Sequence, residues 1–310
     1  MKYIVTGGAG FIGSNLVNRL LIDEHEVIVI DNLVSKNSRH RIENKEVFDW
    51  NDKKNLTFFK ADINNVNDAD VFNNVDAIFH LAALPNVQLS IADPIKHHEV
   101  NINGTLNMLN ACVKHQIKRF IFSSSSSIYG DPKILPSKED SLLDFKSPYA
   151  LHKVVGEHYC KLFSSLYDIE TLSLRYFNVY GPGQPISGAY SPVMGVFSHQ
   201  ILNNEPITIN GDGEQTRDFV FVDDVVNANI LSADLHYDRY NEFNIGSGIE
   251  FSINKIADLF GNKLSRKYKP QIEEPRNSLA DIQKAKTILN WFPKTQLVNW
   301  MEDYKLRLGI

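Results

Sequence analysis

Residues 3–13 of the chain read Tyr3-Ile4-Val5-Thr6-Gly7-Gly8-Ala9-Gly10-Phe11-Ile12-Gly13. The first four residues favour a short strand and helical periodicity begins at Ile12, so the glycines lie between a strand and a helix. In that context one glycine makes the bend, another admits a pyrophosphate to the helix N-terminus, and a third lets helix and strand pack closely. The segment predicts a dinucleotide-binding turn, although a glycine triplet alone is also compatible with a purely structural turn.

A carboxylate at the end of the next strand favours the dinucleotide interpretation. Asp31 ends the second predicted strand, 18 residues after Gly13, where such a fold places the acidic residue that binds the adenosine ribose. A carboxylate repels a 2'-phosphate, and Asn32-Leu33 follow without an adjacent arginine, so we predict NAD rather than NADP as the cofactor. Lys36 and Arg39, a few residues further on, weaken that preference.

Short β-branched segments alternate with longer amphipathic ones through the first half of the chain, as parallel strands joined by crossover helices require. The predicted strands span residues 3–6, 26–30, 57–60, 77–81, 119–123 and 171–175, and the predicted helices span 12–23, 101–115 and 149–167. This pattern predicts an α/β fold of the Rossmann type, a doubly wound parallel sheet that binds ligands at the carboxyl ends of its strands.

The texture of the sequence changes after residue 177. Prolines and glycines crowd residues 180–192, and an amphipathic segment and a short strand at 207–209 follow. We therefore expect a cofactor-binding domain over 1–177 and a smaller α/β substrate-binding lobe over 178–310, with parts of about 218–245 returning to the first domain. The polar stretch 44–55 is interpreted as a surface insertion whose function cannot be read.

Composition excludes several classes of protein. The chain has 310 residues, 43% of them hydrophobic, and a net charge of −5 with scattered lysines and arginines, so nucleic acid is not an expected partner. No apolar stretch reaches the roughly 18 residues that cross a bilayer, and no secretory signal is visible, so we expect a cytoplasmic protein that does not bind membranes. Cys112 and Cys160 are the only cysteines, too few for a tetrahedral zinc site, and no metal is expected.

Tyr149 and Lys153 are four residues apart within a predicted helix, which places the phenol and the ammonium on one face. A free tyrosine has a pKa of about 10 and is a poor base at neutral pH until a neighbouring cation favours its phenolate. The pair therefore predicts a tuned acid/base. Residues 123–127 are five serines that end the fifth strand, where a hydroxyl donor would complement the phenol of Tyr149.

Other strand ends supply further candidates. Asp62-Ile63 follows the third strand and is expected to meet an adenine, with a simple turn as the alternative for Asp62. Leu81-Ala82-Ala83 follows the fourth strand and is expected to line the pyrophosphate and ribose, because backbone must come close there. His80 is interpreted as a core histidine whose ring is satisfied by hydrogen bonds, and no chemistry is assigned to it.

These features together resemble the extended short-chain dehydrogenase/reductase family, and within it the nucleotide-sugar 4-epimerases, over essentially the whole chain. The matching segments are 6–13, 31–32, 62, 80–83, 101–105, 123–130, 149–153, 175–178 and 211–218. With the positions already given, the resemblance implies that the cofactor is contacted by Gly7, Gly10, Phe11, Ile12, Gly13, Asp31, Asn32, Asp62, Ile63, Leu81, Ala82, Ala83, Asn101, Ser123, Tyr149, Lys153 and Tyr176.

The resemblance implies a transient oxidation of a sugar carbon by bound NAD. Tyr149 would remove the proton of the C4 hydroxyl, Lys153 would hold the nicotinamide ribose and lower the pKa of Tyr149, and Ser125 would hydrogen-bond the reacting oxygen, a role that Ser126 shares in an alternative alignment. The 4-keto sugar would turn over before the hydride returns, so that NAD stays bound through turnover.

The family positions also imply the substrate contacts. Asn178 and Arg217 are expected to hold the diphosphate, with the uridine and sugar near Ala189, Tyr190, Val193 and Thr208 to Asn210. Many relatives carry Arg-x-Gly-Asp before Ser-x-Ala-Asp, whereas this chain reads Glu273-Glu274-Pro275-Arg276-Asn277-Ser278-Leu279-Ala280-Asp281 and looks several residues shorter. Arg276 is expected to reach the diphosphate despite this difference.

Ser278 occupies the position that gates the space around the sugar C2 substituent in such enzymes. A serine leaves room for an acetamido group, which favours UDP-GlcNAc and UDP-GalNAc and permits UDP-glucose and UDP-galactose as well. Asn86 and Leu89 depart from the Ser and Arg that relatives handling acetamido sugars often carry.

Three alternatives remain open at this stage. An epimerase or decarboxylase of a UDP-uronic acid is one, and a nucleotide-sugar 4,6-dehydratase is another, although Ser126 and Ser127 replace the Asp-Glu or Thr-Glu that such dehydratases carry. The third is a non-catalytic NAD-sensing protein, which would not need Ser125, Tyr149 and Lys153 together. Relatives commonly form homodimers through the helices at 101–115 and 149–167, and a homodimer is expected here.

Overall fold

The computed structural model describes residues 1–35, 50, 53–66, 70–186, 191–235, 239–261, 264–272 and 274–309. Most of the predicted insertion at 44–55 lies outside the described residues, as do Lys36 and Arg39. Two of the residues expected near the substrate, Ala189 and Tyr190, also lie outside them.

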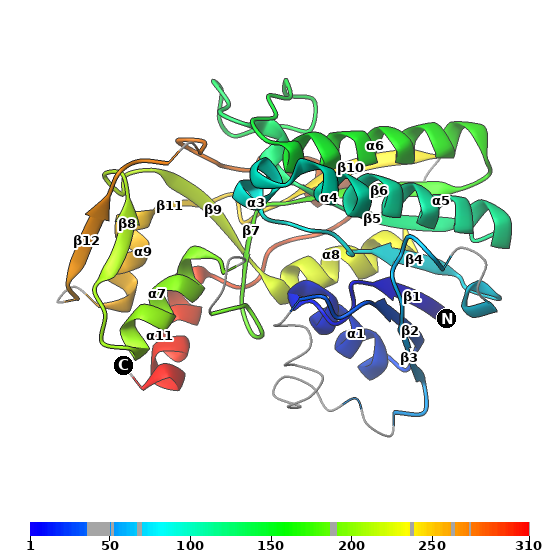
Figure 1. Cartoon of the computed structure of the whole chain (residues 1–310), viewed down its shortest axis with the longest axis horizontal. Coiled ribbons are helices and arrows are strands. Elements are labelled where there is room, and N and C mark those ends of the chain that lie inside the picture. The colour runs from blue at the N-terminus through cyan, green and yellow to red at the C-terminus, as the bar shows by residue number, and fades with distance from the viewer. Residues whose placement is uncertain are drawn as a thin grey trace.

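A seven-stranded parallel sheet forms the centre of the molecule, in the order β10-β6-β5-β4-β1-β2-β3 (Figure 1). Its strands are β1 Lys2–Thr6, β2 Glu26–Asp31, β3 Leu56–Lys60, β4 Ala77–His80, β5 Arg119–Ser125, β6 Glu170–Tyr176 and β10 Tyr240–Ile245. The predicted Rossmann-type α/β fold and its first six strands are confirmed. The strand order reverses between β1 and β4, the place where such sheets open a crevice for ligands.

Helices cover both faces of this sheet (Figure 1). The helices α1 Phe11–Ile22 and α8 Val222–Asp234 lie on one face, and α5 Gly104–His115 and α6 Pro148–Leu166 lie on the other. The predicted helix at 101–115 begins as a π-helical turn, Glu99–Asn103, and continues as α5. Shorter elements connect the layers: η1 Asp70–Phe72, α3 Val87–Ala92, α4 Pro94–His98, η3 Ser126–Tyr129 and α10 Gln283–Ile288.

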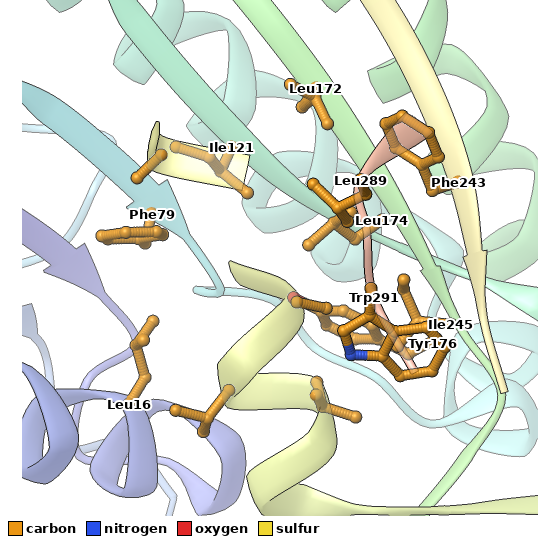
Figure 2. Packing of buried hydrophobic residues seen from close by; sticks show 14 of the residues in the cluster. Leu16, Phe79, Ile121, Leu172, Leu174, Tyr176, Phe243, Ile245, Leu289 and Trp291 are labelled. Carbon is orange, nitrogen blue, oxygen red and sulfur yellow. The ribbon is translucent and has the colours of Figure 1, made fainter. Parts of the chain in front are cut away.

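The core on the α1 and α8 side extends from the N-terminal helix to the far edge of the sheet. Leu16 and Phe79 lie at one end and Phe243 and Trp291 at the other (Figure 2). The Trp291 indole is fully buried and donates a 2.8 Å hydrogen bond to the backbone oxygen of Asp224 in α8. This contact fixes a late segment of the chain on the large sheet.

A smaller lobe has two sheets and a core of its own. It contains β7 Asn178–Tyr180, α7 Val193–Leu202, β8 Ile207–Asn210, β9 Thr216–Phe221, β11 Glu250–Ser252, α9 Ile253–Phe260, β12 Arg266–Lys269 and α11 Leu297–Leu308. Its sheets are ordered β11-β9-β7 and β12-β8, and Phe197, Phe219 and Met301 lie in its core. Between β9 and β11 the chain returns to the large sheet as α8 and β10. The division at residue 177 stays a prediction.

None of the helices in the described ranges combines the length and the apolarity that a membrane crossing requires.

Candidate active site

A cavity of about 1040 Å³ lies at the carboxyl edge of the large sheet and extends to the small lobe. The glycine turn and the ends of β2, β4, β5 and β6 line it on one side. Residues from α7, β8 and β9 line it on the other. One cavity therefore brings together the predicted dinucleotide turn and the predicted acid/base pair.

The glycine turn requires glycine, because a side chain at two of its positions would collide with neighbouring backbone. A Cβ on Gly13 would lie 2.3 Å from the Gly7 oxygen, and one on Gly7, whose φ is +68°, would lie 2.7 Å from the Ala82 nitrogen. Gly10 precedes α1 without a side-chain cap, which leaves the helix N-terminus available to an anion. At the end of β2, the Asp31 carboxylate accepts the Ala9 amide at 3.1 Å, so its charge lies beside the turn.

A chain of hydrogen bonds behind the cavity fixes the backbone that follows β4. The Thr105 hydroxyl donates to the backbone oxygen of Asn101 at 2.7 Å. Its oxygen must therefore accept the proton on His80 Nε2, which lies 3.0 Å away. His80 Nδ1 then accepts from the Thr6 hydroxyl at 2.8 Å, and that hydroxyl accepts the Ala82 amide at 3.2 Å. His80 is thus neutral, and burial lowers its pKa to about 3.

Asn101 extends the same chain into the loop after β4. Its side-chain oxygen accepts the Leu84 amide at 2.7 Å, and its side-chain nitrogen donates to the Leu84 oxygen at 3.1 Å. Asn101 was expected to touch the cofactor, but it lies behind the loop and does not line the cavity. Its amide is fully used in holding backbone, so this residue shapes the cavity from outside.

The helix α6 presents the acid/base pair because of how it begins. Ser147 caps the helix by accepting the Ala150 amide at 3.2 Å, and Pro148 occupies the first turn. Tyr149 and Lys153 then face the cavity one turn apart, and both are buried. Ser125, at the end of β5, lines the cavity beside them, and its side chain influences the Tyr149 phenol. The structure brings Ser125, Tyr149 and Lys153 together.

Burial dominates the electrostatics of this pair. It raises the pKa of Tyr149, and the side chain of Ser125 offsets this rise in part. Burial also lowers the pKa of Lys153 to about 8. The Lys153 ammonium lies 5.8 Å from the centre of the Tyr149 ring and donates to the Ser123 oxygen at 2.6 Å. The expectation that Lys153 lowers the pKa of Tyr149 in the enzyme with bound NAD stays a prediction.

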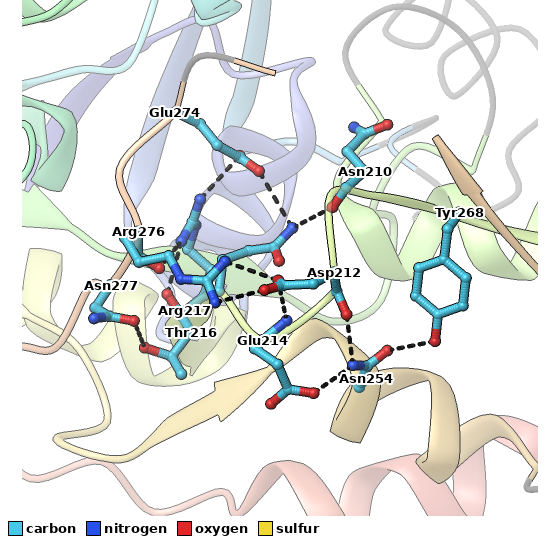
Figure 3. A network of polar contacts seen from close by, with 11 residues as sticks. Asn210, Asp212, Glu214, Thr216, Arg217, Asn254, Tyr268, Glu274, Arg276 and Asn277 are labelled. Atoms are coloured by element: carbon cyan, nitrogen blue, oxygen red, sulfur yellow. Dashed lines mark hydrogen bonds and ion pairs between the residues drawn. The ribbon is translucent and has the colours of Figure 1, made fainter. Parts of the chain in front are cut away.

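Two arginines lie near the small-lobe end of the cavity, and both are paired (Figure 3). Arg217 lines the cavity, with its side chain only 12% exposed, and binds Glu274 at 2.9 Å. Arg276 turns outward instead and holds both oxygens of Asp212 at 2.8 and 2.9 Å. Arg276 therefore does not line the cavity in this arrangement, and its predicted contact with the diphosphate stays a prediction.

Most of the predicted residues line the cavity. On the cofactor side they are Gly7, Gly10, Phe11, Ile12, Gly13, Asp31, Asn32, Asp62, Ile63, Leu81, Ala82, Ala83, Ser123, Tyr149, Lys153 and Tyr176. On the substrate side they are Ser125, Asn178, Val193, Thr208, Asn210 and Arg217. Their roles in binding stay predictions.

Ser126 and Ser278 do not line the cavity. Ser126 is the first residue of the turn η3, directly after the end of β5. Ser278 donates its amide to the Thr216 oxygen at 3.1 Å and lies beside β9, outside the lining residues. The shared role of Ser126 and the gating role of Ser278 stay predictions.

Sequence reasoning missed three charged residues of the cavity: Lys96, Glu99 and Glu274. Lys96 and Glu99 lie in the short helical turns after β4. Charged residues in such turns are usually exposed to solvent, so the sequence alone did not indicate that they line a cavity. Glu274 lies in the segment that looks shorter than in relatives, and it pairs with Arg217, 57 residues earlier in the chain. A contact between such distant positions cannot be predicted from the local sequence pattern.

Comparison with known proteins agrees with the geometry. The model of the NAD-dependent epimerase/dehydratase family matches residues 3–246. A UDP-glucose 4-epimerase of Mycolicibacterium smegmatis is 36% identical, with 96% of this chain and 95% of that protein aligned.

Solved structures of similar proteins cover nearly the whole chain. A UDP-N-acetylglucosamine 4-epimerase of Methanobrevibacter ruminantium, in complex with UDP-N-acetylmuramic acid, is 36% identical with a TM-score of 0.88, and the alignment covers 99% of this chain and 97% of that one. A UDP-glucuronic acid 4-epimerase of Bacillus cereus, in complex with UDP-glucuronic acid and NAD, is 32% identical with a TM-score of 0.88, over 99% and 100% of the two chains. With a family match over most of its length, relatives aligned nearly end to end and a glycine turn shaped for the dinucleotide, this chain belongs to the NAD-dependent epimerase/dehydratase family, the extended short-chain dehydrogenases/reductases, and its cofactor is NAD.

Proposed function

We propose that this chain epimerises C4 of a UDP-sugar, with UDP-GlcNAc and UDP-GalNAc as the preferred pair and UDP-glucose and UDP-galactose as further substrates. The observation that carries the proposal is that Ser125, Tyr149 and Lys153 line the same cavity as the glycine turn. A hydroxyl donor and a phenol that meet at one point can both bind a single reacting oxygen.

The residues divide the work by position. Tyr149 takes the proton of the C4 hydroxyl as the C4 carbonyl forms, and it returns that proton when the opposite epimer forms. Ser125 donates to the same oxygen, and Lys153 keeps a positive charge one helical turn from the phenol. NAD, when bound, supplies the chemistry of removing and returning hydride at the sugar carbon. The two steps cancel, so the reaction has no net oxidation.

The cofactor and the nucleotide would be held at opposite ends of the cavity. Gly7, Gly10 and Gly13 would receive the dinucleotide pyrophosphate, and Asp31 would bind the adenosine ribose. Asn178 and Arg217 would hold the sugar-nucleotide diphosphate, since a buried guanidinium suits two phosphate oxygens.

The acetamido preference rests on two considerations. The related Methanobrevibacter enzyme is named for UDP-N-acetylglucosamine. Several residues that line the cavity have small or uncharged side chains: Leu84, Pro85, Asn86 and Val87 from the loop after β4, with Ser124 and Ser125 from β5. Small side chains permit an acetamido group without excluding a hydroxyl.

One observation favours a second candidate, the 4-epimerisation of UDP-glucuronic acid. Lys96 adds a cation to the cavity beyond Lys153 and Arg217, and a sugar carboxylate would suit it. The Bacillus cereus relative acts on that sugar by name. Incubation with UDP-GlcNAc, UDP-glucose and UDP-glucuronic acid in separate reactions, with chromatographic separation of the C4 epimers, tests the choice. Formation of UDP-GalNAc at the highest kcat/KM supports the proposal, and conversion of the uronic acid alone contradicts it.

We also propose a homodimer formed through α5 and α6. Leu151, Leu162 and Leu166 lie along α6 with 40%, 47% and 62% of their surface exposed, an apolar row that a second copy would cover. Sedimentation of the purified chain at micromolar concentration should give the mass of a dimer, whereas a monomer would contradict this part of the proposal.

A further inference from the structure

The helix α6 grips the end of β5 at two successive residues. Lys153 donates its ammonium to the backbone oxygen of Ser123 at 2.6 Å. One turn later, the Glu157 carboxylate accepts the hydroxyl of Ser124 at 2.5 Å. Ser125 comes next in the strand, so the position of its hydroxyl relative to Tyr149 depends on this double contact.

Both carboxylate oxygens of Glu157 are fixed by hydrogen bonds. The Arg175 side chain binds both of its carboxylate oxygens, with Nε to Oε1 at 2.9 Å and Nη2 to Oε2 at 2.8 Å. Arg175 also donates to the Tyr129 hydroxyl at 2.8 Å, and that hydroxyl donates to the Asn244 side chain at 2.6 Å. Glu157 and Arg175 are each only 5% exposed. The cost of desolvating two buried charges often cancels their attraction, so this ion pair need not stabilise the fold. Its position beside the cavity suggests a role in the site instead.

The negative charge of Glu157 also affects the pKa of Lys153. Burial lowers the pKa of Lys153, and Glu157 is the strongest group that opposes this. The other groups near the ammonium are neutral at pH 7. They are the Tyr149 phenol, the Phe122 ring, the Cys160 thiol, whose pKa is raised by burial, and the imidazoles of His80 and His152, whose pKa values are lowered by burial.

We propose that Glu157 is a positioning residue for the reaction: it fixes the end of β5 on α6 so that Ser125 meets Tyr149, and it supplies the carboxylate that balances the buried charge of Lys153. The inference rests on the proposed function for its catalytic meaning. Its electrostatic part concerns the protein alone and is measured without substrate.

The first experiment titrates Lys153 by NMR in protein carrying 13Cε-labelled lysine. The signal of Lys153 is identified by its loss in Lys153→Met. In Glu157→Gln the carboxylate is lost while Arg175 keeps its charge, so the titration of Lys153 should move to lower pH by about one unit or more. Glu139→Gln is the matched control, because Glu139 accepts the Asn244 amide in the same network and does not act on Lys153. Its titration should equal that of the wild type.

A second variant covers the case in which Glu157→Gln fails to fold. In Glu157→Met/Arg175→Met both charges are removed, and buried ion pairs often tolerate such replacement. Lys153 should again titrate at lower pH than in the wild type. An unchanged titration of Lys153 in either folded variant overturns the electrostatic part.

Ser124→Ala tests the positioning part. It removes the hydroxyl that reaches Glu157 and leaves every charge in place, so turnover should fall about tenfold while the Lys153 titration is unchanged. Wild-type turnover in Ser124→Ala overturns this part. If the wild type turns over none of the UDP-sugars, the proposed function fails, and the titrations still decide the electrostatic inference.

Discussion

The Asp31 carboxylate accepts the backbone amide of Ala9 at 3.1 Å, and this contact joins the end of β2 to the glycine turn between β1 and α1. It places a negative charge beside the cavity at the point where the ribose of a dinucleotide is expected. The contact explains why the choice between NAD and NADP depends on this residue.

Replacement of Asp31 by serine should weaken the binding of NAD about tenfold or more and should strengthen the binding of NADP. The carboxylate supplies charge-assisted hydrogen bonds to a ribose and repels a 2'-phosphate. Calorimetric dissociation constants for both nucleotides measure the change. Asp23→Asn, which removes a carboxylate paired with Arg19 on the surface, serves as the control and should bind both as the wild type does. Equal affinity of the wild type for NAD and NADP would contradict this assignment.

The two arginines should differ in their effect on the nucleotide. Arg217 lines the cavity, whereas Arg276 holds Asp212 outside it. Arg217→Ala should therefore weaken the binding of UDP by roughly 10- to 100-fold, the loss expected for a charge-assisted pair with phosphate.

Arg276→Ala is the matched comparison and should change the binding of UDP less than about threefold, since an exposed ion pair contributes little. Calorimetric titration of the wild type and of each variant with UDP gives the dissociation constants to compare. Equal losses in the two variants would show that Arg276 leaves Asp212 to bind the nucleotide.

His80 should make the stability of the protein depend on pH. Burial lowers the pKa of His80 to about 3, below the ordinary value of 6.5, so the unfolded chain binds a proton that the folded chain does not. The contribution of His80 to the free energy of unfolding is therefore fully present above pH 6.5 and is lost as the pH is lowered from 6.5 towards 3. The slope is about 1.4 kcal/mol for each pH unit in that window.

The comparison is with His80→Gln, which cannot take up the proton. Urea unfolding at pH 7.5 and pH 5 should show the wild type losing about 2 kcal/mol more than the variant between the two conditions. Other titrating groups, His152 included, affect both proteins alike. Identical pH dependence in the two proteins would mean that His80 accepts a proton in the folded state.

Features set by neighbouring residues were predictable from sequence. The glycine turn, the first six strands and the spacing of Tyr149 and Lys153 are local, because the period of a strand or helix places each residue. Asp31 was found for the same reason, as it ends a strand directly after the turn. The residues that line the cofactor side of the cavity follow from these elements.

Contacts between distant segments were not predictable. Arg276 was expected at the substrate, but its partner Asp212 lies 64 residues earlier in the chain. Glu274 and Arg217 meet in the same way, and the pairing of Glu157 with Arg175 joins a helix to a strand. The rise that burial causes in the pKa of Tyr149 was also not predictable, because spacing shows that a cation is near and does not show how deeply the phenol is buried.

Tyr149→Phe removes the one hydroxyl on which the proposed proton transfer depends and preserves the ring. The measurement is the rate of interconversion of UDP-GlcNAc and UDP-GalNAc by the wild type and by Tyr149→Phe, with NAD binding measured in both as a control for folding. We predict that the wild type forms both epimers and that kcat of the variant falls about 100- to 10,000-fold with NAD still bound. Full turnover by Tyr149→Phe would contradict the account.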